Sequence, residues 1–147
     1  MMFCSLLRDH GDWCTGTAAQ NAPLPLNAYV EGCVNPPCAL PKGQEVVVHL
    51  VFRAPRTTTK MTTLAQAFLL FFPINYPLND HADTCSFLTN SFCPVRANDV
   101  VQYTLRMMIE NLPVNVAPSV EIRIEDDSNR PVTCIRVPVV IAPPLKP

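Results

Sequence analysis

The chain has 147 residues, enough for one domain with a buried core. Its net charge of −1, with no cluster of Lys and Arg, argues against nucleic-acid binding, which needs a basic surface to neutralise phosphates. Hydrophobic residues make up 48% of the chain and charged residues 16%, yet no apolar run approaches the roughly 18 residues of a membrane span. The apolar surplus therefore indicates an internal apolar cavity in a soluble protein.

Residues 1–13 are expected to be an N-terminal extension outside the folded domain. Their apolar run is too short for a secretory signal peptide, because Arg8, Asp9 and His10 end it. We interpret this extension as the remnant of a signal peptide or as a disordered segment. Cys4 lies within it, before any strand signal, and is the cysteine expected to stand outside a disulfide framework.

Four segments alternate between apolar and polar residues and are predicted to be strands. They are Glu45–Phe52, Asp99–Glu110, Val120–Asp126 and Val132–Ile141. Polar or proline-containing turns separate them, notably the sequence EDDSNRP before the last strand. This pattern is typical of an antiparallel β-sandwich, in which one face of each sheet is buried and the other is solvated.

The alternation also predicts which side chains face the core, since neighbouring residues on a strand point to opposite faces. The expected inward-facing residues are Val46, Val48, Leu50, Phe52, Val101, Tyr103, Leu105, Met107, Ile109, Val120, Ile122 and Ile124. Among them only Tyr103 carries a polar group, and we interpret it as a core tyrosine whose hydroxyl finds a partner.

The segment Lys60–Phe72 has two interpretations. Its apolar residues fit the i, i+3, i+4 spacing of a helix, whereas five threonines between positions 57 and 63 resist helix and suit a pleated surface. We predict a strand here, although the period alone does not separate the two.

Seven cysteines are many for a reduced cytosolic domain of this size. Such a density is typical of a disulfide framework formed in an oxidising compartment. Secretion, or residence in a lumen such as that of the lysosome, is therefore inferred from the cysteines and not from a visible signal peptide.

The pair Cys33–Cys38 has three readings: half of a metal site, part of a catalytic centre, or a clip that ends a loop before a strand begins. Zinc sites favour cysteines two to four residues apart with a second such pair or histidines nearby. Cys85 and Cys93 have seven residues between them, and of the histidines only His81 lies near a cysteine. Motifs of hydrolases, metalloproteases and phosphate-binding loops are absent from the sequence. We therefore expect no metal, no cofactor and no enzymatic activity.

The order of the cysteines and the sequences that flank them resemble those of a known protein family. Cys14 precedes the first strand, the Cys33–Cys38 pair is followed by ALPKGQ, the Cys85–Cys93 pair by proline, and Cys134 lies in the final strand. With FFPINYPL, DDSN and CIRVPVVI at matching places, this frame resembles the ML lipid-recognition domain family, and within it the branch of soluble Niemann–Pick type C sterol carriers. The resemblance covers roughly residues 14–141.

The resemblance implies an all-β fold over residues 14–142, followed by a short tail at 143–147. The expected architecture is an immunoglobulin-like β-sandwich of about seven antiparallel strands with an apolar cavity between its sheets. The implied disulfides are Cys14–Cys134, Cys33–Cys38 and Cys85–Cys93.

Position by position, the resemblance also implies a set of lipid-binding residues. Ile74 and Tyr76 match residues near the entrance, Val114 matches the cavity mouth, and the others match inward-facing strand positions. The full set is Val30, Leu40, Phe68, Leu70, Ile74, Tyr76, Tyr103, Val114, Ile122, Ile135 and Val137. Without the resemblance, each of these would be read as a core residue.

The implied function is that of a secreted, monomeric lipid-binding and transport protein that exchanges its ligand with membranes or a membrane-bound acceptor. Ile122 and Ile135 stand where the sterol carriers have tryptophan, so fatty acids, other isoprenoids and small hydrophobic semiochemicals fit as well as sterols. The alternative is an innate-recognition or adhesion module that binds proteins through its loops. A cavity of several hundred Å³ would favour the lipid carrier, and a filled interior would favour the alternative.

Overall fold

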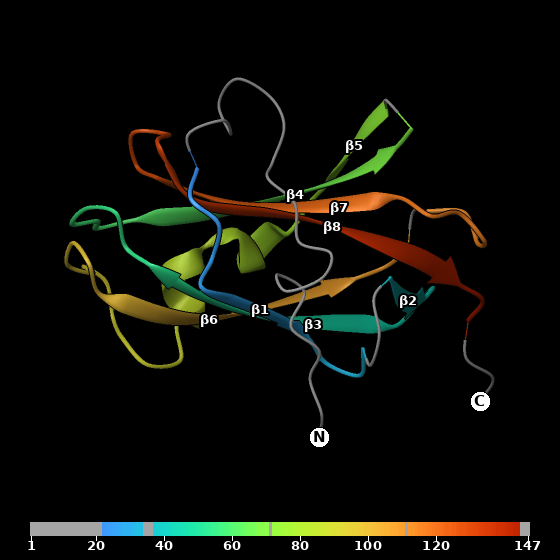
Figure 1. Ribbon diagram of the computed structural model, residues 1–147, viewed down its shortest axis with the longest axis horizontal. Coiled ribbons are helices and arrows are strands. Elements are labelled where there is room, and N and C mark those ends of the chain that lie inside the picture. Colours follow the sequence, from blue (N-terminus) through green and yellow to red (C-terminus); the bar gives the residue numbers. More distant parts are fainter. Residues whose placement is uncertain (1–21, 34–36, 71, 111, 145–147) are drawn as a thin grey trace.

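The computed structural model describes residues 22–33, 37–70, 72–110 and 112–144. Within these ranges, eight strands form two sheets that pack face to face (Figure 1). The elements are β1 (Asn27–Val30), β2 (Cys38–Pro41), β3 (Glu45–Arg53), β4 (Met61–Leu69), β5 (Phe72–Tyr76), the 3₁₀ helices η1 (Asn79–Ala82) and η2 (Thr84–Phe87), β6 (Val100–Met108), β7 (Ser119–Asp126) and β8 (Pro131–Ala142).

One sheet has the order β1-β3-β6, and the other has the order β2-β8-β7-β4-β5. Every pair is antiparallel except β2–β8, which is parallel. The predicted all-β sandwich is confirmed. The short parallel strand β2 was not predicted, because its four residues show too little alternation to be distinguished from a loop. The helices η1 and η2 contact both β4 and β6 and so cover one open edge between the sheets (Figure 1).

The predicted inward-facing positions of β3, β6 and β7 are all buried. The segment with two interpretations is a strand, β4, as predicted, and it sends Thr63, Ala65 and Ala67 inward. On β7 the alternation is incomplete, because Glu121, expected outward, is also buried. Pairing across β3 and β6 places Leu50 opposite Tyr103 and Val46 opposite Met107.

Two of the three expected disulfides are present, Cys33–Cys38 and Cys85–Cys93. Because its sulfurs are joined to each other, the Cys33–Cys38 pair is a clip between β1 and β2 and not half of a metal site. Cys134 is also disulfide-bonded; its expected partner Cys14 and the expected outsider Cys4 lie outside the described residues. Among the residues that the structure describes, no helix is long and apolar enough to cross a membrane.

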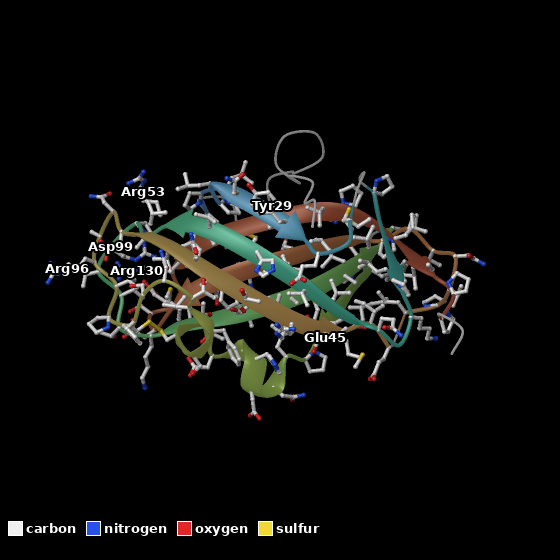
Figure 2. All side chains as sticks on the ribbon, turned by 90° about the horizontal axis from the view of Figure 1, so that it is seen from below. Tyr29, Glu45, Arg53, Arg96, Asp99 and Arg130 are labelled. Atoms are coloured by element: carbon white, nitrogen blue, oxygen red, sulfur yellow. A yellow bond between two sulfur atoms is a disulfide. The ribbon has the colours of Figure 1, made fainter. Side chains whose placement is uncertain are left out.

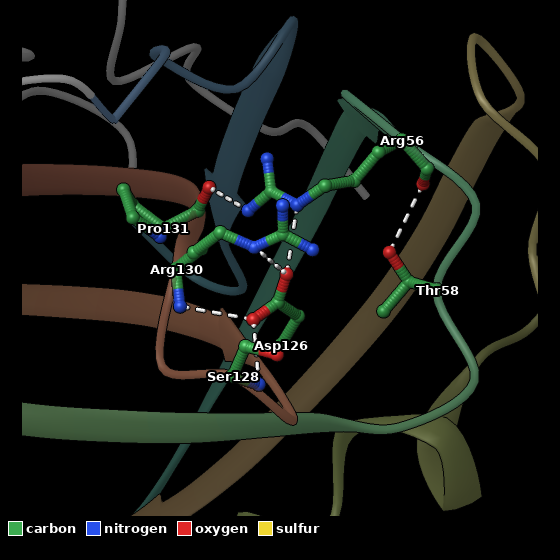
Figure 3. Close-up of polar contacts among 6 residues, drawn as sticks. All are labelled: Arg56, Thr58, Asp126, Ser128, Arg130 and Pro131. Carbon is green, nitrogen blue, oxygen red and sulfur yellow. Dashed lines mark hydrogen bonds and ion pairs between the residues drawn. The ribbon is translucent and has the colours of Figure 1, made fainter.

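The turn between β7 and β8 is organised by the buried carboxylate of Asp126 (Figure 3). Its Oδ1 accepts hydrogen bonds from the backbone N–H groups of Ser128 and Arg130, each at 2.9 Å. Its Oδ2 accepts from Nε of Arg56 at 2.7 Å and from Nε of Arg130 at 3.1 Å. Arg56 also donates from Nη2 to the carbonyl of Pro131 at 2.8 Å. One carboxylate thus joins the β3–β4 loop to the β7–β8 hairpin.

Charged side chains gather at one end of the sandwich, where Figure 2 shows Arg53, Arg96, Asp99 and Arg130. This is the end at which β3 finishes and β6 begins, since Arg53 pairs with Val100. The inward-facing pair Val46 and Met107 lies toward the opposite end of the same two strands.

Candidate ligand cavity between the sheets

A small hollow lies between the inner faces of the two sheets. Its volume is about 20 Å³, which is close to the space that one water molecule occupies. Every side chain that lines it is apolar: Ala28, Val30, Leu40, Val46, Val48, Leu50, Met107, Ile109, Val120, Ile122, Ile135, Val137 and Val139. Such a wall offers no hydrogen bond and no charge, so it suits only the apolar part of a ligand.

The hollow is far smaller than the several hundred Å³ expected of a preformed lipid cavity. The inner faces carry valine, leucine and isoleucine at nearly every position, and these side chains meet across most of the interior. The interior is therefore apolar and incompletely filled, yet a lipid enters it only if the sheets separate or the side chains repack.

Five of the residues expected to bind lipid come together in this wall: Val30, Leu40, Ile122, Ile135 and Val137. They lie on β1 of the three-stranded sheet and on β2, β7 and β8 of the five-stranded sheet. The remaining wall comes largely from β3 and β6, whose inward residues the alternation predicted without assigning them to a ligand site. The alternation of apolar and polar residues along β3 and β6 is the sequence signal that identifies these wall residues.

The expectation that Phe68 and Leu70 face inward is wrong. Because Ala65 and Ala67 take the inward positions of β4, the period of two places Phe68 on the outer face. There the guanidinium of Arg136 lies over its ring, 4.0 Å from the centroid. Leu70 occupies the β4–β5 turn with φ of 57° and is 86% exposed.

Tyr76 and Ile74 lie on the edge strand β5 and do not line the hollow. The ring of Tyr76 is buried, and its hydroxyl accepts a hydrogen bond from the backbone N–H of Glu110 at 2.8 Å. This contact joins the five-stranded sheet to Glu110, two residues beyond the end of β6 in the other sheet. Outside it is a surface pocket of about 320 Å³ to which Tyr76, Glu110 and Met107 contribute. Met107 also lines the hollow, so this one side chain borders both the pocket and the hollow.

Tyr76→Phe should remove this contact while keeping the ring. We expect the free energy of unfolding to fall by about 0.5–1.5 kcal/mol, the usual net contribution of one hydrogen bond. Hydrogen–deuterium exchange should show faster exchange of the Glu110 amide and unchanged exchange at Leu105, within the β3–β6 ladder. Equal acceleration at both amides would mean that the variant loosens the sheet as a whole.

Val114 lies in the segment before β7, half-buried and outside the wall of the hollow. The same segment is tied to β8, because Asn115 N–H donates to the carbonyl of Ile141 at 2.8 Å and Ile141 N–H donates to Val116 at 2.9 Å. Val114 therefore lies beside the C-terminal end of β8. It is near Ile109 and Val120 of the wall in the sequence, but it does not line the hollow itself.

Tyr103 is buried beside the hollow and does not line it. Burial raises the pKa of Tyr103 to about 12, and the neighbouring hydroxyl of Thr63 opposes this only in part. The polar neighbour of its hydroxyl is Thr63, whose Oγ1 shares a hydrogen bond of 2.6 Å with Oγ1 of Thr84.

A family model described as the ML domain matches residues 12–141. The chain belongs to the ML domain family. This ML domain is 28% identical over 112 residues to the mouse protein named NPC intracellular cholesterol transporter 2, a match that covers 76% of this chain and 73% of the relative. The bovine protein of the same name is 21% identical over 112 residues, with the same coverage.

The fold of this ML domain is also that of a solved relative. The crystal structure of a Niemann-Pick type C2 protein from the Japanese carpenter ant superposes with a TM-score of 0.66 at 15% identity, covering 96% of this chain and 99% of the other. The resemblance inferred from the cysteine frame, in both family and fold, is confirmed.

Proposed function

We propose that this ML domain binds one small lipid between its two sheets and carries it within an oxidising compartment, outside cells or in a lumen. The observation that carries the proposal is the hollow, whose whole wall is apolar and is contributed by both sheets. The disulfides support the compartment, since they persist where thiols are not kept reduced. The names of the mouse and bovine relatives, as cholesterol transporters, support a lipid as the cargo.

The energetics permit binding if the sheets separate cheaply. A ligand that buries ~400 Å² of apolar surface gains ~10 kcal/mol, at ~25 cal/mol/Å². Association removes ~4–15 kcal/mol of this, and widening the hollow removes more. A slender or flexible lipid needs less widening than a rigid one. The wall contains no aromatic residue, so sterols, fatty acids and other isoprenoids remain the candidate classes.

The direct test is to identify the cargo. Protein purified from its own source, examined by native mass spectrometry and then extracted, should release one lipid per chain. Delipidated protein should retain labelled sterol or fatty-acid probes and return them chemically unchanged, as a carrier without enzymatic activity does. Retention of no lipid of any class would contradict the proposal. It would favour the second function, a protein-recognition module, which the narrowness of the hollow already suits.

We further propose that the β4–β5 hairpin, which projects from the sandwich (Figure 1), delivers the bound lipid to a membrane. Leu70 at its turn is 86% exposed and Phe72 is 71% exposed. The same strand continues to Tyr76, at the edge between the sheets. Two large apolar side chains on a projecting turn are suited to enter a lipid surface.

The double substitution Leu70→Ser with Phe72→Ser should slow the transfer of a bound fluorescent lipid to phosphatidylcholine vesicles at least severalfold, because the turn no longer enters the bilayer. Equilibrium binding of the lipid should not change. The matched control is Phe92→Ser, which removes an 88%-exposed phenylalanine from the Cys85–Cys93 loop. If the control slows transfer as much, the hairpin has no special role.

A further inference from the structure

Four arginines from separate parts of the chain come together at one end of the sandwich. Arg53 is the last residue of β3, Arg56 lies in the loop that follows, Arg96 lies in the loop before β6, and Arg130 lies in the turn between β7 and β8. They are four of the eleven Lys and Arg residues of the chain, and no two of them are adjacent in the sequence. Figure 2 shows three of the four at this end. We call these four residues the arginine end.

Hydrogen bonds hold the first two loops of the arginine end against each other. Thr58 and Val95 each donate a backbone N–H to the other's carbonyl, at 2.9 and 3.0 Å. Arg53 reaches the same loop, because its Nη1 donates to the carbonyl of Asn98 at 3.1 Å. Within the part of the chain that the structure describes, neither Arg53 nor Arg96 forms an ion pair with a carboxylate. Both side chains are exposed, so they present positive charge to the solvent.

The guanidinium groups of Arg56 and Arg130 lie side by side on one carboxylate oxygen (Figure 3). Both donate from Nε to Oδ2 of Asp126, at 2.7 and 3.1 Å. The side chain of Asp126 is 2% exposed, whereas those of Arg56 and Arg130 are 26% and 59% exposed. Two positive charges therefore share one buried negative charge, and they repel each other. An anion that approached from solvent would relieve this repulsion and use the remaining N–H groups of both side chains.

The carboxylates at this end do not neutralise the arginines. Asp126 already accepts from two of them. Asp99 uses its Oδ2 to accept the backbone N–H of Arg96 at 3.0 Å. Asp127 is exposed on the turn that precedes Arg130. The arginine end therefore carries an excess of positive charge, although the net charge of the whole chain is −1.

The arginine end faces away from the surface proposed to deliver lipid. Strand β4 begins at Met61, which pairs with Asp126, and ends at Leu69, beside the exposed turn at Leu70. The hairpin and the arginine end thus lie at opposite ends of one strand. A bilayer that receives the hairpin does not meet the arginines, so their partner is a different anionic molecule. This choice of partner rests on the proposed role of the hairpin.

We propose that the arginine end binds the sulfate groups of a sulfated polysaccharide. Guanidinium groups pair with oxyanions through parallel N–H donors. A sulfate ester presents three oxygen atoms where a carboxylate presents two, so one sulfate can accept from Arg56 and Arg130 together. A chain that carries several sulfates also reaches Arg53 and Arg96. Such chains occur outside cells, in the oxidising compartment that the disulfides favour.

The test measures the affinity of the full chain for heparin, a highly sulfated polysaccharide, by titration calorimetry at several salt concentrations. The double substitution Arg53→Gln with Arg96→Gln should lower the affinity about three- to tenfold, as expected for the loss of two exposed ion pairs. The affinity should also depend less on salt in this variant. Its thermal stability should equal that of the wild type, because neither arginine pairs with a carboxylate within the described ranges.

A second variant addresses the paired arginines. Arg130→Gln removes one of the two charges at Asp126 and leaves Arg56 to pair with this carboxylate. It should weaken heparin binding to a similar extent. Polyglutamate and phosphatidylserine vesicles should bind the wild type more weakly than heparin does, because they lack sulfate esters. Equal or tighter binding of either one overturns the preference for sulfate and with it the inference.

The matched control is Arg106→Gln with Lys42→Gln. It removes two positive charges from the opposite end of the sandwich, where Arg106 pairs with Glu45 and Lys42 follows β2. This control should bind heparin as the wild type does. An equal loss of affinity in the control, or no heparin binding by the wild type, overturns the inference. Lipid retention measured on the same proteins should not change, so failure here leaves the proposed function standing.

Discussion

Replacing Ile122 with alanine should lower the free energy of unfolding by about 2–5 kcal/mol and change the size of lipid that the protein accepts. Ile122 is buried and lines the hollow, so its loss both removes packing and adds volume to the wall. The ratio of bound sterol to bound fatty acid should rise, because a bulkier ligand then needs less separation of the sheets. Urea unfolding measures the first effect, and competition between labelled probes measures the second.

Ile124→Ala is the matched control for this prediction. Ile124 lies two residues further along β7, faces the same side and is fully buried, but it does not line the hollow. Its replacement should destabilise the protein by a similar amount and leave the ratio of bound lipids unchanged. If both variants shift the ratio equally, ligand choice depends on general loosening of the core and not on the wall of the hollow.

Asp126→Asn should lower the free energy of unfolding by about 2 kcal/mol near neutral pH. Burial alone would raise the pKa of Asp126, but hydrogen bonds from Arg56 and from two backbone N–H groups, with the charge of Arg56, lower it from 3.8 to about 2. A carboxyl whose pKa is lower in the folded state stabilises that state above its unfolded pKa. The stabilisation is lost as the pH falls through the folded value.

The difference between wild type and Asp126→Asn should therefore be constant from neutral pH to about pH 5 and should shrink between about pH 4 and pH 2. Denaturant unfolding across this range measures it. Asp127→Asn, at the exposed neighbouring position, should have little effect at any pH. A difference that stays constant down to pH 2 would show that the carboxylate charge contributes nothing and that only shape matters at this turn.

The walls of the hollow were predictable where strands are long and strictly alternating. On β3 and β6 a period of two continues through nine residues, so Val46, Val48, Leu50 and Met107 could be assigned to the interior from sequence alone. Phe68 could not, because its segment also fits a helix and because a shift of one residue in a strand reverses every side chain. The small residues Ala65 and Ala67 took the inward positions that the larger Phe68 was expected to occupy.

The size of the hollow was not predictable. An apolar surplus indicated a cavity, but part of that surplus lies on the surface, at Leu70, Phe72 and Phe92. How closely the inner faces approach depends on interdigitation of side chains from strands far apart in the sequence, which composition does not record.

The clip between Cys33 and Cys38 has a mechanical consequence. The chain leaves the three-stranded sheet at Val30 and joins the five-stranded sheet at Cys38, and the disulfide covalently ties this crossing. At the opposite margin the sheets are joined by the Tyr76–Glu110 hydrogen bond and by the longer stretch of chain through η1 and η2 that leads from β5 to β6. We therefore expect the two sheets to separate more readily along β5 and β6 than along β1 and β2, where the disulfide holds a short crossing.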